Sequence, residues 1–194
     1  YRESKEAWLS VMRNLVSRGL QPPLLAIGDG ALGFWSALRE LEVFANTKEQ
    51  RCWVHKIANV LSKLPKRVQS EAKSLLHEMM NAPDLSSANK AKKDFKEIFN
   101  DKYEKAVVCL EKDWTQLITF FNFPAKHWTN LRTTNPIESA FSTVKHRTRQ
   151  TKGSGSPKVA ESLAFKLLSE AEKRWNKIRG VEEIANLIAG IDYK

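Results

Sequence analysis

Cysteine is scarce in this chain, and long apolar runs are missing from it. Cys52 and Cys109 are the only cysteines among 194 residues. Two cysteines cannot build a disulfide framework, so the composition fits a reducing cytosol. No apolar run approaches the roughly 18 residues that a membrane-spanning helix needs, so we expect no membrane partner. Internal repeats and low-complexity tracts are also absent, which excludes repeat architectures.

Acidic residues are in deficit. The 32 Lys and Arg residues outnumber the 22 Asp and Glu residues, which gives a net charge of +10. From Arg132 to Lys152, Glu138 is the only acid. This balance favours an anionic partner, nucleic acid first, although simple solubility is the alternative. Six Trp and nine Phe argue against disorder, and the length suffices for one domain with or without an insertion.

Helix and strand signals alternate in the first part of the chain. Apolar residues at helical spacing predict a helix over about 3–19. The short apolar run 24–28 predicts a strand buried on both faces, and a helix follows Asp29. A second strand is predicted over 50–55, followed by a helix that Pro65 interrupts. This alternation indicates an α/β fold.

The middle of the chain, 66–125, carries helical patterns only. Asp84 or Ser86 is a suitable cap for the second of these helices. Asn135 is predicted to cap a later helix that has Pro136 at its first position. The helices predicted after the middle of the chain cover about 136–148, 158–177 and 181–190.

Asp29 and Glu138 are the acids whose positions raise a functional question. Asp29 follows a predicted strand, at the edge where open α/β sheets bind ligands, but its spacing alone favours a simple turn in which Asp29 caps the following helix. Glu138 lies in a first helical turn, where an ordinary capping role is the alternative. Ser142, Lys145 and Arg149 follow on the same helix face. A metal-bound carboxylate with cations along its helix would suit a DNA backbone.

Three segments carry a resemblance to a known family. The segments "IGDGALGFWSAL", "RCWVHKIANVL" and "RTTNPIESAFSTVKHRTRQTKG", in that order, resemble Mutator-type insertion-sequence transposases over essentially the whole chain. The resemblance implies a DDE-class enzyme with an RNase H-like fold. We expect an α/β remnant of about two parallel strands with an all-helical insertion, mostly α overall. The implied parts are a catalytic core at 1–64 and 126–151, an insertion at 65–125 and a helical tail at 152–194.

The resemblance also implies the chemistry. Three acids of such enzymes bind two Mg²⁺ or Mn²⁺ ions, and Asp29 matches the second acid and Glu138 the third. No residue here matches the first acid, because the chain begins after the first three strands. Asp101 and Asp113 lie in the insertion and do not replace it. We therefore expect a C-terminal piece of a longer transposase, inactive alone, although a trimmed or processed chain is an alternative explanation for its start.

Basic residues around Glu138 are candidates for DNA contact. Arg132 and Asn135 precede Glu138, and Lys145, Arg147, Arg149 and Lys152 follow it. A charge run is often only a solvated face, but the position beside Glu138 favours phosphate contacts. The implied partners are the DNA of transposon ends and targets and further copies of the chain, in a bacterial cytoplasm at the nucleoid. A non-catalytic helical DNA-binding or regulatory protein is the alternative function.

Cys52 and His55 form a C-x-x-H pair. Such a pair can be half of a zinc site, but no second pair with ligand spacing accompanies it. The transposase superfamily carries a C-x-x-H motif after the last strand, so the resemblance implies a place near the active site. A buried thiol beside a hydrogen-bonded histidine is the structural alternative.

Overall fold

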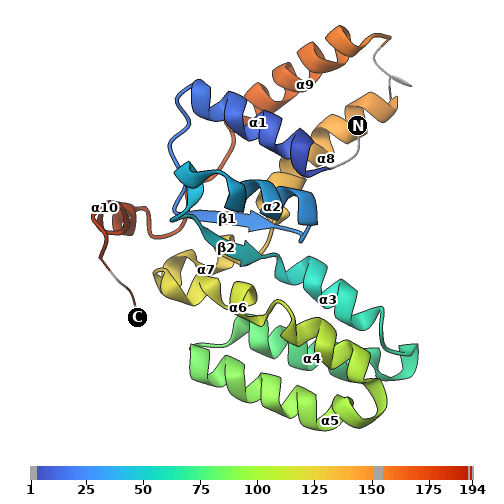
Figure 1. The fold of residues 1–194 in the computed structure, drawn as a ribbon. Helices are drawn as coiled ribbons and strands as arrows, with labels where there is room; N and C mark the ends of the chain where they lie inside the picture. Colours follow the sequence, from blue (N-terminus) through green and yellow to red (C-terminus); the bar gives the residue numbers. More distant parts are fainter. Residues whose placement is uncertain (1–3, 151–154, 192, 194) are drawn as a thin grey trace.

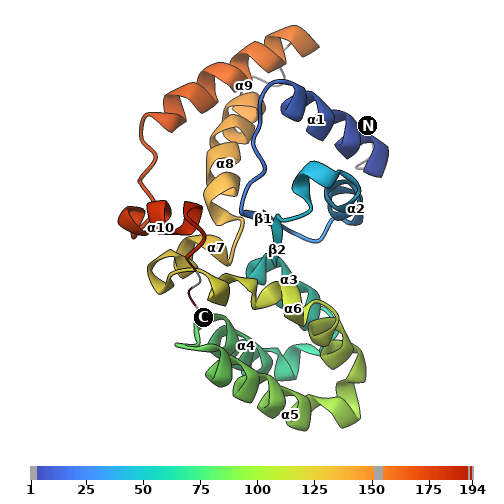
Figure 2. The same ribbon diagram turned by 60° about the vertical axis from the view of Figure 1, so that its left-hand side comes forward.

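The computed structural model describes residues 4–150, 155–191 and 193, and the chain is mostly helical with one small parallel sheet (Figure 1). Helices α1, α2, α8 and α9 lie on one side of the sheet, and α3 to α6 lie on the other side (Figures 1 and 2). The expectation of a mostly α protein with about two parallel strands is therefore confirmed. The elements are α1 (Lys5–Ser17), β1 (Leu25–Gly28), α2 (Leu32–Glu40), β2 (Lys48–Arg51), α3 (Trp53–Leu61), α4 (Lys66–Asn81), α5 (Leu85–Glu111), α6 (Trp114–Leu117), α7 (Trp128–Leu131), α8 (Asn135–Gln150), α9 (Pro157–Glu172) and α10 (Ile184–Ile188), with short 3₁₀ helices at Glu42–Phe44, Thr119–Asn122, Ala125–His127 and Val181–Glu183.

Strands β1 and β2 run parallel, in a register that sets Gly28 opposite Arg51. Cys52 donates its backbone N–H to the Gly28 carbonyl at 2.8 Å, just past the end of β2. The Cys52 carbonyl then accepts a bond from the Lys56 N–H at 3.0 Å, which begins α3. The second strand predicted over 50–55 is therefore present, but it lies at Lys48–Arg51, because the chain turns into a helix directly after this bond.

Strand β1 is less buried than its sequence predicts. All four of its residues are half-buried, and Leu24 just before it is 50% exposed. Ala26 packs toward α1 and α2. Among the described residues, β2 is the only strand that pairs with β1. The prediction of burial on both faces is wrong, because every residue of β1 stays partly exposed.

Helices α1 and α2 pack together around a small apolar cluster. Ser4 caps α1 by accepting a hydrogen bond from the Ala7 N–H at 3.2 Å, so the helix predicted over 3–19 is confirmed in its described part. The aromatic rings of Trp8 and Phe34 meet edge to face, 5.1 Å apart, beside this cluster. The buried residues of the cluster are Leu9, Met12, Trp35, Ala37, Leu38 and Phe44.

The main apolar core lies among α3, α4, α5 and α6, and the described secondary structure of 66–125 is helical, as predicted. Asp84 caps α5 by accepting a hydrogen bond from the Ser87 N–H at 2.7 Å. The prediction that Pro65 interrupts the helix after the second strand is wrong. Pro65 is the N-cap of α4 and does not interrupt α3, because α3 already ends at Leu61.

A buried glutamine joins the sheet to this helical layer. Gln50 of β2 is fully buried, and its Nε2 donates to the Leu117 carbonyl at 3.1 Å. Its Oε1 accepts a bond from the Phe120 N–H at 2.8 Å. The indole of Trp53 donates to the same Leu117 carbonyl at 2.9 Å. These bonds fix the end of β2 against the helical layer.

The C-terminal part follows α8 with α9 and a short helix, α10. Helix α9 ends at Glu172, so the helix predicted over 158–177 is too long, and Trp175 lies outside it with its side chain exposed. His127 Nε2 lies 2.8 Å from the Gly180 carbonyl and ties this part to the segment before α8. The three-part division implied by the resemblance stays a prediction. None of the described helices combines the length and the apolar character needed to cross a membrane.

Candidate active site

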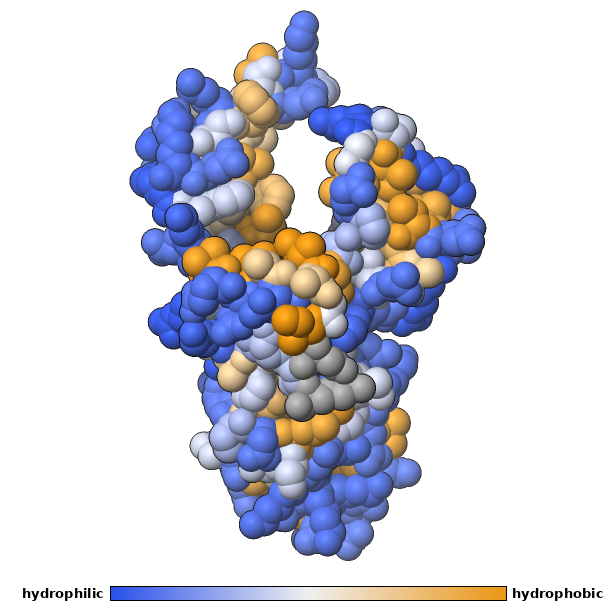
Figure 3. Space-filling model, turned by 90° about the vertical axis from the view of Figure 1, so that its left-hand side faces the viewer, coloured by the Kyte–Doolittle hydropathy of each residue, from blue (hydrophilic) through white to orange (hydrophobic). Residues whose placement is uncertain are grey.

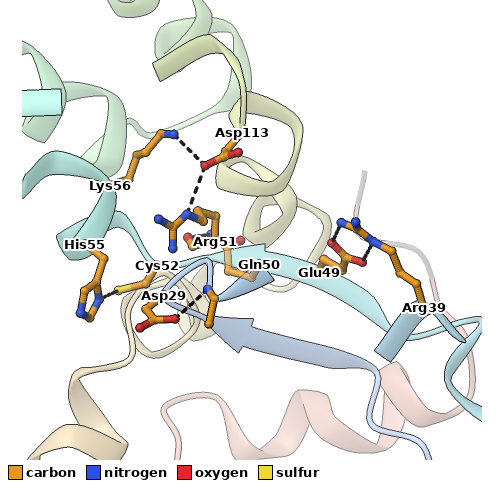
Figure 4. A network of polar contacts seen from close by, with 10 residues as sticks. Asp29, Arg39, Glu49, Gln50, Arg51, Cys52, His55, Lys56 and Asp113 are labelled. Carbon is orange, nitrogen blue, oxygen red and sulfur yellow. Dashed lines mark hydrogen bonds and ion pairs between the residues drawn. The ribbon is translucent and has the colours of Figure 1, made fainter. Parts of the chain in front are cut away.

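Asp29 lies in the turn that leaves β1. Its Oδ1 accepts a hydrogen bond from the Ala31 N–H at 3.1 Å, which closes the turn before α2 (Figure 4). Gly30 has φ +93°, and a Cβ at this position would come within 2.2 Å of the Arg51 guanidinium carbon. Glycine suits this position, because it adopts a positive φ readily and has no Cβ to collide with Arg51. The packing of Gly30 against Arg51 therefore fixes the turn, and with it Asp29, at the carboxyl end of the sheet.

Glu138 lies in the first turn of α8. The backbone N–H groups of Ile137 and Glu138 both donate to the Thr134 carbonyl at 3.1 Å, and the Thr134 hydroxyl donates to Glu138 Oε1. Asn135 is already the first helical residue. The prediction that Asn135 caps the helix is therefore wrong, because Thr134 satisfies the backbone and the side chain of the first turn.

One cleft of about 530 Å³ is lined by both acids. Asp29 enters it from the turn after β1, while Glu138 and Lys145 enter it from α8. Figure 3 shows the molecule hollowed between the part with α1 and α2 and the part with α8 and α9, with hydrophobic atoms along the hollow. The two acids, far apart in the sequence, thus face one space. Its apolar lining residues are Trp8, Ile27, Ala31, Phe34, Ile137 and Phe141.

Cys52, His55 and Thr134 form a polar cluster beside Glu138. Cys52 Sγ accepts a hydrogen bond from the Thr134 N–H at 3.3 Å and lies 3.2 Å from His55 Nδ1. His55 Nδ1 lies 3.8 Å from Glu138 Oε1. The structure thus brings the C-x-x-H pair next to the third implied acid, and the residue that connects them, Thr134, is one that the sequence analysis missed.

The cluster shifts the ionisation of both members of the pair. Burial raises the pKa of the Cys52 thiol, but hydrogen bonds from Thr134 and His55 together outweigh burial and hold that pKa below its ordinary value. The bond with Cys52 raises the pKa of His55, and the charges of Cys52, Glu138 and Asp29 act in the same direction against burial. Both shifts favour the charged forms, so the cluster is strongly polar.

The two acids fit part of a site for a hard divalent ion. Their hydrogen bonds from Ala31 and Thr134 use Asp29 Oδ1 and Glu138 Oε1, which leaves Oδ2 and Oε2 for another ligand. Carboxylate oxygens are the ligands that Mg²⁺ and Mn²⁺ prefer. In the part of the chain that the structure describes, no three His, Cys, Asp or Glu side chains group closely enough to hold a metal ion. The metal-binding roles of Asp29 and Glu138 therefore stay predictions.

A second hollow, of about 890 Å³, follows α8 and is called the cationic groove here. Lys145 lines both this groove and the cleft, so the two hollows are adjacent. Arg174, just after α9, also lines it, and the sequence analysis missed this residue because it is remote from the basic run. The groove is lined by Ser142, Thr143, Lys145, His146, Arg147, Arg149, Gln150 and Arg174.

Three other candidates for DNA contact have different surroundings. Arg132 Nη1 donates to the Met80 carbonyl at 2.6 Å, and burial lowers the pKa of the guanidinium. Its charge is thus turned toward the end of α4. Asn135 begins α8, and Lys152 lies outside the described residues. The DNA-binding roles of these three residues stay predictions.

Asp113 joins the helical layer to the end of β2. Its Oδ2 accepts bonds from Lys56 Nζ at 2.7 Å and Arg51 Nε at 3.2 Å (Figure 4). The Lys56 side chain is only 3% exposed, and that of Arg51 is 9% exposed. Asp113 and Asp101 are not among the residues that line the cleft. Asp113 therefore pairs with two buried cations next to the turn that carries Asp29.

Comparison with known proteins relates the chain to one family. The family model described as "Transposase, Mutator family" matches residues 1–178. The transposase for insertion sequence element IST2 of Acidithiobacillus ferrooxidans is 50% identical over 193 residues, which cover 99% of this chain and 64% of that protein. The transposase for insertion sequence element IS6120 of Mycolicibacterium smegmatis is 48% identical over 190 residues, which cover 98% of this chain and 58% of that protein. The chain thus spans about three fifths of the length of these relatives.

Proposed function

Because the chain belongs to the Mutator family of transposases, we propose that it forms the part of a DDE-type transposase that carries the second and third catalytic acids. The substrate is DNA, and the reaction is metal-dependent strand cleavage followed by strand transfer. The observation that carries the proposal is that Asp29 and Glu138 line one cleft. The position of Asp29 after a parallel strand agrees with the RNase H-like core that the resemblance implies.

In this proposal, Asp29 and Glu138 bind Mg²⁺ or Mn²⁺ through the carboxylate oxygens that their own hydrogen bonds leave unused. Bound ions would activate a water molecule or a 3′-hydroxyl and would stabilise the leaving oxygen of an in-line displacement. The turn after β1 holds one acid and the first turn of α8 holds the other. Trp8 and Phe34 line the same cleft and give it an apolar part.

We also propose that this chain has almost no activity by itself. No residue of the chain matches the first acid of the family pattern, so the ions would be held by two protein carboxylates in place of three. Fewer carboxylates mean weaker binding of a hard ion. Activity then requires a further acid from protein outside these 194 residues.

The cationic groove supplies the path for the DNA backbone. Lys145 lines both hollows, so a strand whose scissile phosphate lies at the two acids can continue along α8. Contacts of this kind fix the position of DNA without reading its sequence. We further propose that the protein acts on bacterial DNA in the cytoplasm, as an assembly of copies. The edge of β1 without a described neighbouring strand supports association.

Iron in place of magnesium tests whether the two acids share an ion. With ascorbate, bound Fe²⁺ produces radicals that cut the backbone close to its ligands. We expect cuts near positions 29 and 138, and we expect both sets to vanish in Asp29→Asn and in Glu138→Gln, because each carboxylate holds the same ion. Mass spectrometry of the fragments measures the cuts, and excess Mg²⁺ should suppress them.

Glu161→Gln is the matched control for this experiment, because Glu161 is an exposed glutamate of α9 that does not line the cleft. Its cuts should equal those of the parent chain. If cuts near position 29 persist in Glu138→Gln, the two acids bind separately and the proposed site is wrong.

Salt dependence tests the role of the cationic groove. We expect Lys145→Ala combined with Arg149→Ala to lower the slope of log K against log salt concentration by about 1.8, since each phosphate contact contributes about 0.9. Fluorescence anisotropy with labelled duplex DNA measures the slope. The control pair is Lys90→Ala with Lys102→Ala, two exposed lysines of α5. If both pairs of substitutions lowered the slope equally, DNA binding would depend only on net charge and the proposed role of the cationic groove would be wrong.

A further inference from the structure

We propose that Thr134 is a positioning residue that aims the Glu138 carboxylate into the cleft, and that Cys52 holds Thr134 in place for this task. The inference rests on the proposed function, because it concerns the presentation of Glu138 to an ion. It is carried by contacts that join the start of α3 to the start of α8.

Glu138 needs such a partner more than Asp29 does. The Glu138 side chain is 51% exposed and has one more rotatable bond than an aspartate. Asp29 is short, and the Ala31 N–H already holds its carboxylate. A long exposed carboxylate loses conformational freedom when it binds an ion, which weakens binding unless the side chain is held beforehand.

Thr134 contacts Glu138 through two separate groups. Its carbonyl accepts the N–H of Glu138 at 3.1 Å, and its hydroxyl donates to Glu138 Oε1. The bond from the Thr134 hydroxyl uses Glu138 Oε1, so Oε2 is available to bind an ion. One residue thus sets both the start of α8 and the orientation of the side chain in its first turn.

Cys52 anchors Thr134. The Cys52 side chain is fully buried, and its Sγ lies 3.3 Å from the Thr134 nitrogen and 3.2 Å from the Thr134 hydroxyl oxygen. A hydroxyl has one proton and can serve only one acceptor at a time. The bond from the Thr134 N–H to Cys52 keeps Thr134 in place while its hydroxyl serves Glu138. His55 Nδ1, 3.5 Å from that hydroxyl, borders the same cluster.

The anchor also connects the two acids. The Cys52 N–H donates to the carbonyl of Gly28, the residue directly before Asp29, at 2.8 Å. A continuous path of hydrogen bonds therefore leads from the turn of Asp29 through Cys52 and Thr134 to Glu138. The path links the backbone next to Asp29 to the Glu138 carboxylate, which is the arrangement expected of residues that support metal ligands.

Two substitutions at one position test the inference. Thr134→Val keeps the shape of the side chain and removes the hydroxyl, while Thr134→Ser keeps the hydroxyl and removes the methyl group. Tb³⁺ is the probe, because it prefers oxygen ligands and Trp8 in the cleft can sensitise its luminescence. We expect Tb³⁺ to bind Thr134→Val about 10- to 100-fold more weakly than the parent chain, and Thr134→Ser to retain most of the affinity.

The outcomes separate this inference from the proposed function. If Asp29→Asn and Glu138→Gln leave Tb³⁺ binding unchanged, the shared site does not exist and both proposals are wrong. If these variants lose binding and Thr134→Val does not, the positioning role alone is wrong. Equal losses in Thr134→Val and Thr134→Ser, with equally lowered melting temperatures, would indicate a structural role and also overturn the inference.

Discussion

Replacing Glu138 by Gln is expected to lower strand transfer about 10³-fold or more in an active transposase that contains this chain. Glutamine keeps the size of the side chain but lacks the charge that binds a hard ion. Ions of such a site supply several kcal/mol of transition-state stabilisation, and each 1.4 kcal/mol or so changes the rate tenfold. The loss should follow from weaker ion binding, because Gln can still accept the bond from the Thr134 hydroxyl.

A hybrid protein makes this measurement possible. In the hybrid, this chain replaces the matching 193-residue segment of the Acidithiobacillus ferrooxidans relative, which supplies the remaining part of its own length. Mn²⁺-dependent joining of labelled IST2 element ends to a plasmid measures the activity. Glu161→Gln serves as the control and should retain it. The catalytic assignment of Glu138 would be contradicted if the hybrid with Glu138→Gln transferred strands at a rate within tenfold of the unsubstituted hybrid.

Replacing Asp113 by Ala is expected to lower the free energy of unfolding by about 3 kcal/mol. The substitution leaves Lys56 and Arg51 as buried charges without this carboxylate. Breaking a buried ion pair costs about 3–5 kcal/mol, and the low end applies because the Asp113 side chain is itself 26% exposed. Urea denaturation followed by circular dichroism measures the change, and an unchanged slope against urea would show that the variant folds normally.

Asp101→Ala provides the comparison for Asp113, because Asp101 is an exposed aspartate on α5. It should change the free energy of unfolding by less than about 0.5 kcal/mol. A loss below about 1 kcal/mol in Asp113→Ala would show that Lys56 and Arg51 find other partners and that the ion pairs matter little.

Acid gives a second measurement of the same contacts. Burial raises the pKa of Asp113, but the bonds from Lys56 and Arg51 outweigh burial and lower it. Because the folded pKa lies below the ordinary carboxyl value near 3.8, the stabilisation is complete above about pH 4 and is lost as the pH falls through the folded pKa. The difference between the parent chain and Asp113→Ala should therefore shrink below pH 4.

Local signals predicted much of the helical structure. Asp84 caps α5 as its residue type predicts, and Ser4 begins α1. The predicted ends of elements are wrong where a hydrogen bond to another residue determines where the strand or helix begins or ends. The second strand ends early because Cys52 bonds to Gly28, and Thr134 takes the place expected for Asn135 because its carbonyl and hydroxyl reach the first turn of α8. Local propensity contains neither kind of information.

The candidate site was predicted in part. Asp29 and Glu138 stand out through the resemblance and their positions at element ends, and both line the cleft. Thr134 and Arg174 could not be recognised, because a threonine before a helix and an arginine after one are common. Asp113 acquires its role only through Lys56 and Arg51, which are distant in the sequence. Long-range contacts of this kind depend on the packing of the whole chain.

The Glu138 carboxylate and the Lys145 and Arg149 cations all belong to one continuous helix, α8. Adding a single residue between Glu138 and Lys145 would rotate the cations by about 100° relative to the acid. Under the proposed function, the distance from the metal-binding acid to the nearest phosphate contacts is therefore set by the rise of the helix, and a tilt of α8 moves both together. Under the proposed function, a preference for particular DNA ends would then depend on other surfaces, because a change of length within this part of α8 would misplace the cations relative to the acid.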